Sequence, residues 1–403
     1  MGRRAAWVIY LAPGDGHATK IRILQCVRSN SSASELVRPR NDRRTSCAEI
    51  LVDIRPKSPA TTIAMHVEKL FVGGLGYCGS RIAEAIHDAY PSAIISGTVR
   101  SKERRDALMD GASRPSWLTG SAHVLDLDDK YAGLSSDGIA DLQSSTVVVQ
   151  TVAPIADFDR DPLLALHGDA LESSEALQYV AYLSSTGVYG DYGGDWVAEE
   201  SELRCVDAKS KARVVAEQEW CKLEPANDDD SSAGPRVDCF RCGGIYGPGR
   251  GPLFSSISSL NAALDAETEE VPRQAPAVTK YVNRILVDDI CGAILAAIEG
   301  DRPRCGGRAY NLVDDDPAPR KEVVVEARRL LSPSSSEDIH GQSTASVSTS
   351  DAATKNTRRR ISRATGNKRC DNGRLKEGYG WSLKAPTYRE GLALLLETSD
   401  LKL

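Results

Sequence analysis

The stretch Val67-Glu-Lys-Leu-Phe-Val-Gly-Gly-Leu-Gly-Tyr-Cys-Gly79 joins an apolar run to a turn that is rich in glycine. Residues 67–72 have the composition of a buried strand, and residues 80–89 repeat apolar side chains at helical spacing. Two glycine patterns overlap between them, Gly74-x-Gly76-x-x-Gly79 and Gly73-x-x-Gly76-x-x-Gly79. A strand, such a turn and a helix in this order are typical of a loop that binds the phosphates of a dinucleotide.

The glycines of such a loop have separate tasks. Gly76 has no Cβ, so backbone N–H groups can approach a pyrophosphate, and Gly79 lets the helix pack close to the strand. The first N–H groups of the helix have no partner within it and carry a partial positive charge. We therefore predict cofactor contacts along the whole turn, from Gly73, Gly74, Leu75, Gly76, Tyr77, Cys78 and Gly79.

Short apolar strands alternate with helical patterns along most of the chain. The predicted strands are residues 67–72, 93–99, 122–127, 146–150, 179–184 and 237–241. Strands that are apolar throughout indicate a parallel sheet with helices on both faces. The sequence therefore predicts an α/β fold, a doubly wound parallel sheet of the Rossmann type, with a small interleaved C-terminal substrate region.

The end of the second predicted strand bears on the choice of cofactor. An NAD site places an acidic residue there, whereas this chain has Thr98-Val-Arg100-Ser-Lys102. A guanidinium group can pair with a 2′-phosphate through two hydrogen bonds. We predict NADP(H), with Arg100 as the main contact and Ser101 and Lys102 as auxiliary ones. NAD, with Arg100 as an ordinary surface residue, stays the alternative.

Two later strand ends supply further predicted contacts. Asp126 ends the third strand, where it could meet the adenine amine. Ala153 and Pro154 follow the fourth strand, beside the expected ribose.

Composition limits the classes of partner. The 403 residues are 41% apolar and 26% charged, as in globular proteins, and the net charge is −6. The negative balance argues against nucleic acid, and no apolar run approaches the ~20 residues of a membrane span. We expect a small-molecule substrate, no nucleic-acid or membrane partner, and a monomer or homodimer.

The ten cysteines are scattered, which suggests free thiols in a reducing compartment. Cys239-Phe-Arg-Cys242 has the spacing of a metal-ligand pair, but its neighbours predict a strand. Residues three apart in a strand point to opposite faces, and no second ligand pair is present. We predict no metal site.

Three regions are predicted. Residues 1–66 form a leader with eleven Lys and Arg against five Asp and Glu, which leaves −12 for the rest of the chain. The leader is either a transit peptide or a disordered segment that precedes a true start at Met65, so the protein is cytoplasmic or directed to a plastid or mitochondrion. Residues 67–300 form the Rossmann domain, and 301–400 the C-terminal substrate region, with a disordered insert at 332–356.

Several ordered motifs resemble the extended short-chain dehydrogenases/reductases, the NAD-dependent epimerase/dehydratase group. Besides the glycine turn they are Tyr182-Leu-Ser-Ser-Thr-Gly-Val-Tyr-Gly190, Arg241-Cys-Gly-Gly-Ile-Tyr-Gly-Pro-Gly249, Arg284-Ile-Leu-Val-Asp-Asp289 and Tyr310-Asn-Leu-Val-Asp-Asp-Asp-Pro317. The residues from Ser184 onward are similar to the atypical, YeeZ-like branch. The resemblance covers residues 67–330 and 357–397 and implies that Ser184, Gly244 and Ile245 also lie beside the cofactor.

The resemblance implies a catalytic tyrosine with a lysine four residues later, and this chain departs from that pattern. None of its thirteen tyrosines has a lysine at that position. Ser185, with Thr186, matches the family's substrate-orienting hydroxyl, but Lys209 stands at the tyrosine position and Arg213 at the lysine position. Tyr192 is a candidate source of a phenol.

Lys209, or Lys211, is a candidate for proton transfer if burial lowers its pKa. The alternative for both lysines is a solvated helix face, and for Tyr192 a structural role.

Two functions follow, and a third is less favoured. The chain is expected to be an NAD(P)(H)-binding oxidoreductase or epimerase/dehydratase-like enzyme that acts on a carbonyl or nucleotide-sugar type of substrate. The missing Tyr–Lys pair leaves open a non-catalytic NADP(H)-binding sensor or scaffold. An RNA-binding module on the same fold is disfavoured by the −12 charge of residues 67–403.

Overall fold

The computed structural model describes residues 66–129, 131–155, 160–225, 234–255, 279–300, 307–331 and 366–398, and the backbone of 5–12, 19–27 and 49–54. It divides into two units, residues 1–63 and 64–403. The predicted disordered insert at 332–356 lies outside the described residues.

The first unit contains a small antiparallel sheet. Strands β1 (Ala5–Ala12), β2 (Thr19–Val27) and β3 (Glu49–Ile54) pair in the order β1-β2-β3. Strands are not predicted for residues 1–66, which show no sustained periodicity. Trp, Val, Ile and Tyr at residues 7–10 favour a strand. Whether the leader is a transit peptide stays a prediction.

The second unit is built on a parallel sheet of seven strands in the described part of the chain, in the order β14-β10-β8-β7-β4-β5-β6. The strands are β4 (Lys69–Gly73), β5 (Ile94–Val99), β6 (Ala122–Val124), β7 (Val147–Gln150), β8 (Tyr179–Ser185), β10 (Arg236–Cys242) and β14 (Arg308–Leu312). The predicted strands and the doubly wound α/β fold are confirmed. The chain moves outward from β4 to β6 and then returns to β7, so strand order reverses between β4 and β7, where such sheets bind ligands.

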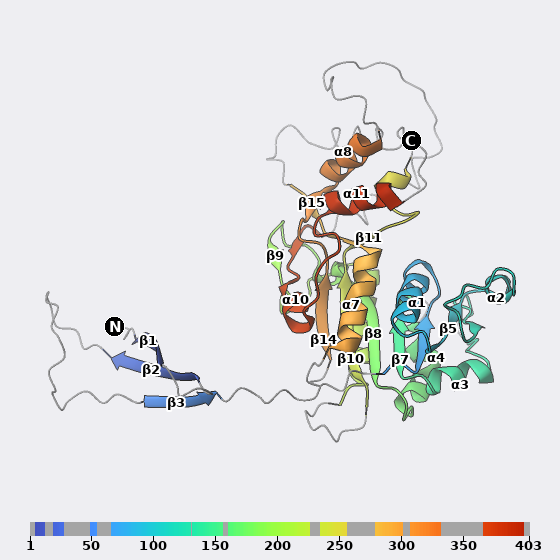
Figure 1. Ribbon diagram of the computed structural model, residues 1–403, viewed down its shortest axis with the longest axis horizontal. Helices are drawn as coiled ribbons and strands as arrows, with labels where there is room; N and C mark the ends of the chain where they lie inside the picture. The colour runs from blue at the N-terminus through green and yellow to red at the C-terminus, as the bar shows by residue number, and fades with distance from the viewer. Residues whose placement is uncertain are drawn as a thin grey trace, which may run out of the picture. The chain divides into compact units, whose positions relative to one another are not determined.

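Helices cover both faces of this sheet (Figure 1). Helices α1 (Tyr77–Ala89), α2 (Lys102–Met109), α7 (Val287–Glu299) and α10 (Gly373–Tyr379) contribute to the apolar cluster on one face. Helices α3 (Ser136–Gln143), α4 (Pro162–Glu172) and α5 (Ala208–Cys221) contribute to the cluster on the other. Alternate residues of β4 face opposite clusters, Leu70 and Val72 on one side and Phe71 on the other, as the two-residue period of a strand requires.

The CxxC pair behaves as predicted. Both cysteines are buried within β10, with Cys239 in the cluster against α5 and Cys242 in the cluster against α7. They therefore point to opposite faces of the sheet and cannot bind one metal ion together.

The C-terminal region has its own apolar cluster. It joins Leu253 of η2 (Pro252–Phe254), Leu286 of β13 (Arg284–Leu286), and helices α8 (Arg320–Leu331) and α11 (Tyr388–Thr398). Short strands β9 (Trp196–Val197), β11 (Gly244–Tyr246), β12 (Tyr281–Val282), β15 (Ala318–Pro319) and β16 (Arg369–Cys370) connect it to the rest. Strand β14 belongs to the main sheet although it follows residue 300, so the sheet extends beyond the predicted Rossmann range. Over the described ranges, no helix has the length and apolarity needed to span a membrane.

Candidate functional site

The predicted glycine turn lies between the end of β4 and the start of α1, at the carboxyl edge of the sheet. Gly74 has a φ of +95°, in the left-handed region that favours glycine. A Cβ on Gly79 would overlap the carbonyl oxygen of Gly74, so α1 approaches the turn this closely only with glycine there. A Cβ on Gly76 would meet nothing within 4 Å, and no side chain caps α1 at this residue. The N-cap residue of α1 therefore supplies no side-chain acceptor to the first N–H groups of the helix.

Neighbouring strands fix the shape of this turn. The N–H of Gly74 donates to Thr98 Oγ1 at 2.8 Å, and the N–H of Leu75 donates to the Thr98 carbonyl at 2.7 Å. Thr151, which directly follows β7, places its hydroxyl within hydrogen-bond distance of the carbonyls of Gly73 and Gly74, at 3.0 and 2.9 Å. The turn is held in place by the protein itself, as a rigid anion-binding loop requires.

The first turn of α1 carries two half-buried polar side chains. Burial raises the pKa of the Tyr77 phenol and of the Cys78 thiol, so both are neutral at neutral pH. The Arg250 guanidinium lies 5.2 Å above the Tyr77 ring. This edge of the loop therefore presents a cation beside the first turn of α1, and the Asp288 carboxylate also lies near enough to act on the Tyr77 phenol.

The residues predicted to contact the 2′ substituent of the adenosine ribose follow strands at the same edge of the sheet. Arg100 follows β5, is exposed, and its Nη2 lies 3.3 Å from Asp128 Oδ1. Ser101 caps α2, since its Oγ accepts from the Arg104 N–H at 3.3 Å. Asp126 is half-buried and its Oδ1 accepts from the Asp128 N–H at 2.9 Å. Beyond β7, Ala153 is exposed and Pro154 half-buried.

Strand β8 ends in two serines with different surroundings. Ser184 is buried, and its hydroxyl donates to Glu217 Oε1 at 2.6 Å, next to the Arg241–Glu217 ion pair of 2.8 Å. Ser185 is half-buried, and its Oγ accepts from the Gly187 N–H at 3.1 Å, which caps η1 (Thr186–Tyr189). Ser184 thus donates to a buried carboxylate, whereas the Ser185 hydroxyl accepts a backbone N–H at the start of η1.

Helix α5 carries the two positions that hold the catalytic Tyr and Lys in the family, and the two side chains here differ in exposure. Lys209 is exposed, as is Lys211. Arg213 is half-buried, and its Nε has no hydrogen-bond partner among the described residues. Its guanidinium acts to lower the pKa of the Tyr182 phenol and of the Cys242 thiol, although burial raises both pKa values overall. Arg213 therefore brings an incompletely bonded cation to the ends of β8 and β10.

The Tyr192 side chain makes two contacts of its own. Its hydroxyl donates to the Glu202 carbonyl at 2.8 Å, and the Arg204 guanidinium lies 4.3 Å above its ring. Gly244 is exposed and Ile245 half-buried in β11, which pairs in parallel with β13. The roles predicted for these residues stay predictions.

Sequence reasoning missed three polar residues near this edge. Ser210 of α5 is buried, and its Oγ would lie 3.0 Å from a Cβ on Gly187, so it faces the Ser185 loop. Lys368 is buried and its Nζ donates to the Gly190 carbonyl at 3.1 Å; burial lowers the pKa of this amine. Asp161 is described below. The helical period could have indicated Ser210, but nothing near Lys368 in the sequence links it to this loop.

Asp161 caps α4 beneath the end of β7. Its Oδ1 accepts from Gln150 Nε2 at 2.7 Å and from the Leu163 N–H at 3.0 Å. Its Oδ2 makes no hydrogen bond of ordinary geometry within the described ranges, although the Trp220 indole lies close by. Burial raises the pKa of this carboxyl to about 6.

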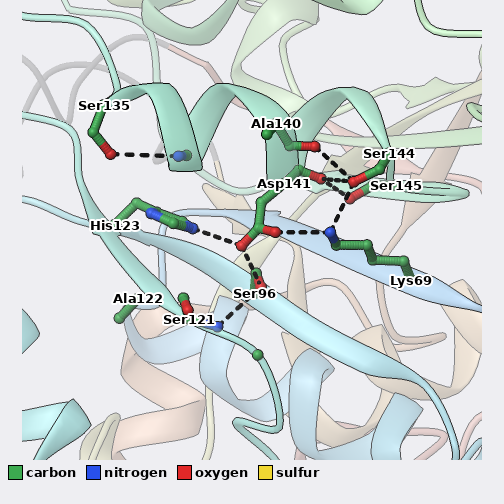
Figure 2. A network of polar contacts seen from close by, with 12 residues as sticks. Lys69, Ser96, Ser121, Ala122, His123, Ser135, Ala140, Asp141, Ser144 and Ser145 are labelled. Atoms are coloured by element: carbon green, nitrogen blue, oxygen red, sulfur yellow. Dashed lines mark hydrogen bonds and ion pairs between the residues drawn. The ribbon is translucent and has the colours of Figure 1, made fainter.

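A second polar cluster lies at the amino edge of the sheet (Figure 2). Asp141 of α3 accepts from Lys69 Nζ at 2.7 Å, from Ser96 Oγ at 2.9 Å and lies 2.8 Å from His123 Nε2. A serine, a histidine and an aspartate here resemble a hydrolase triad in composition alone. Because the serine bonds to the aspartate rather than to the histidine, the cluster has no activated nucleophile.

Comparison with known proteins agrees with this fold. No protein-family model matches the chain. The protein YeeZ of Escherichia coli (strain K12) is 25% identical over 272 residues, which are 66% of this chain and 84% of YeeZ. A functionally unknown conserved protein from Silicibacter pomeroyi DSS is 30% identical in structure-based alignment, with a TM-score of 0.57 over 82% of this chain and 98% of that one.

A more distant solved structure shares the fold alone. UDP-glucuronic acid 4-epimerase from Bacillus cereus in complex with NAD is 14% identical, with a TM-score of 0.53 over 82% of this chain and 96% of that one.

Proposed function

Because this chain is an atypical, YeeZ-like member of the extended short-chain dehydrogenases/reductases, we propose that it binds a nicotinamide dinucleotide across the carboxyl edge of its main sheet. The observation that carries this proposal is the uncapped start of α1 over the open side of Gly76. Unpaired N–H groups at a helix N-terminus bind phosphate, and the turn lies where strand order reverses between β4 and β7. The bound cofactor would supply hydride transfer.

We propose NADP(H) as the preferred form. Arg100 lies at the end of β5, where the 2′ substituent of the adenosine ribose is expected, and β5 carries no acid at that end. A guanidinium group forms two charge-assisted hydrogen bonds to a phosphate dianion, whereas the 2′-hydroxyl of NAD(H) carries no charge. NAD(H) is the alternative, and the titration below compares the affinities for NADPH and NADH.

The residues around β8 would orient a substrate. Ser185 and Thr186 would direct a carbonyl or hydroxyl oxygen of a carbonyl compound or nucleotide sugar toward the nicotinamide. Arg213 would hold the nicotinamide ribose, because its Nε is unpaired and its charge is permanent. The same permanent charge prevents it from acting as a base, so the proton must be exchanged by a group outside the family's Tyr–Lys pair.

A non-catalytic sensor or scaffold is the second candidate. The missing Tyr–Lys pair favours it, together with the exposed Lys209 and the Tyr192 hydroxyl that donates to Glu202. A protein of this kind would bind the cofactor tightly and leave it unchanged.

Fluorescence titration with NADPH and NADH tests the binding proposal. Gly76→Val should weaken affinity at least about tenfold, since its side chain would obstruct amides that bond a charged phosphate. Arg100→Ala should weaken NADPH binding by roughly the same factor and leave NADH nearly unaffected. The proposal fails if wild type binds neither dinucleotide, or if Gly76→Val binds as wild type does.

Turnover on a panel of carbonyl compounds and nucleotide sugars separates the two candidates. Cofactor oxidation or sugar conversion that Ser185→Ala abolishes would support the enzyme. Tight binding without turnover across the panel would support the sensor.

A further inference from the structure

The charges around Arg100 suggest a further determinant of cofactor choice. Strands β5 and β6 are parallel neighbours, and the N–H of Leu125 donates to the Val99 carbonyl at 2.9 Å, which carries their pairing past the end of β6. The chain that leaves β6 therefore runs beside the chain that leaves β5. It brings Asp128 to 3.3 Å from the Arg100 guanidinium.

Asp128 is part of a short acidic loop, Asp126-Leu-Asp-Asp129, that faces this guanidinium. Its backbone is ordered by the bond from the Asp128 N–H to Asp126 Oδ1, so the carboxylate of Asp128 is presented outward. Asp129 has a different task, since its Oδ1 accepts from the Tyr131 N–H at 3.0 Å. Asp128 is thus the acid of this loop that is ion-paired with Arg100.

The pair contributes little to folding. The side chains of Arg100 and Asp128 are 68% and 87% exposed, and ion pairs in such surroundings stabilise proteins only slightly. The consequence for binding is larger. A 2′-phosphate dianion at Arg100 would have to displace a carboxylate from the same guanidinium and would then lie close to its negative charge.

We propose that Asp128 is a specificity-determining residue that occupies Arg100 and lowers the preference of the site for NADP(H) over NAD(H). The proposal rests on the dinucleotide function proposed above. NADP(H) binding requires Arg100 to turn from Asp128 to the 2′-phosphate. NAD(H) has no 2′-phosphate, so the Arg100–Asp128 pair can stay intact when it binds.

Dissociation constants for NADPH and NADH test this in wild type, Asp128→Asn, Asp129→Asn and Arg100→Ala. Asp128→Asn should bind NADPH about three- to tenfold more tightly and NADH no more tightly than wild type. The gain should shrink as salt is raised, because both charges are exposed. Asp129→Asn, which removes one charge from the same loop, should give a clearly smaller gain.

The double variant Arg100→Ala/Asp128→Asn tests whether Asp128 acts through Arg100. Without Arg100 there is no guanidinium to release, so the gain from Asp128→Asn should fall to that of Asp129→Asn. Equal gains from the two aspartate variants in the wild-type background, or an unchanged NADPH to NADH ratio, would overturn the proposal. Wild type that binds neither dinucleotide would overturn the proposed function itself, and this result is distinct from an unchanged ratio.

Discussion

Two aspartates show how differently the two edges of the main sheet are built. At the amino edge, partial burial acts to raise the pKa of Asp141, but hydrogen bonds from Lys69, His123 and Ser96 outweigh it and hold the pKa below its ordinary value. At the carboxyl edge, burial dominates and raises the pKa of Asp161 to about 6, with one oxygen left without an ordinary hydrogen bond. The paired cluster stabilises the fold, whereas the carboxyl edge retains groups with unused bonding capacity.

The same contrast extends beyond the aspartates. In Figure 2 each oxygen of the Asp141 carboxylate has a side-chain donor. At the carboxyl edge, the described residues include an uncapped helix start, an unpaired Nε on Arg213 and an unpaired hydroxyl on Tyr182. Unsatisfied polar groups cost stability wherever they lie, and the described residues carry others away from this edge, such as Arg236 Nε at the start of β10.

The largest expected change in the free energy of unfolding comes from Gly79→Ala at the carboxyl edge. The new Cβ would overlap the Gly74 carbonyl oxygen and separate α1 from β4, which should lower the free energy of unfolding by about 3 kcal/mol. Gly76→Ala is the matched control, since its Cβ meets nothing within 4 Å and should cost less than about 1 kcal/mol. Urea unfolding measures both, and equal losses would contradict the close approach of α1 to the turn.

Asp161→Asn should change how stability depends on pH. The folded pKa is near 6 and the unfolded one is about 3.9, so between these values the folded state retains a proton that the unfolded state has lost. Relative to the variant, which cannot titrate, wild type should therefore lose up to about 3 kcal/mol as pH rises from 4 to 6. Urea titrations of wild type and variant across pH 4–8 measure this, and a difference between the two that does not change with pH would contradict it.

Asp141→Asn should act at the amino edge with the opposite dependence on pH. The folded pKa is depressed, so the contribution of the carboxylate is present above the unfolded pKa of about 3.9 and is lost as pH falls through the folded value. At pH 7 the variant should lose about 1–2 kcal/mol and keep its dinucleotide affinity. A loss of affinity comparable to that of Gly76→Val would show that the two edges are not independent.

The smallest effect is expected from Lys209→Ala. This lysine occupies the family's tyrosine position but is exposed, so the change should alter the free energy of unfolding by less than about 0.5 kcal/mol. Turnover on any substrate identified by the panel should also persist. Abolished turnover with intact cofactor binding would instead make Lys209 the proton-transfer group.

The strands and the glycine turn could be predicted because their signals are local. An apolar run such as Val147–Gln150 and the spacing of Gly74, Gly76 and Gly79 depend only on neighbouring residues. The same holds for the CxxC pair, whose opposite orientation follows from the strand period. Strands β1–β3 were not predicted because residues 1–66 as a whole show no sustained periodicity, although Trp, Val, Ile and Tyr at residues 7–10 favour a strand.

The α/β sheet, the position of the glycine turn and the absence of a Tyr–Lys pair follow from the sequence alone, because each depends on residues that are adjacent or regularly spaced along the chain. The exposure of Lys209, the hydrogen bond from Tyr192 to a carbonyl and the approach of Asp128 to Arg100 arise only in the folded chain. Burial, pKa and ion pairing arise from residues that are distant in sequence and close in space. No local pattern records which of them meet.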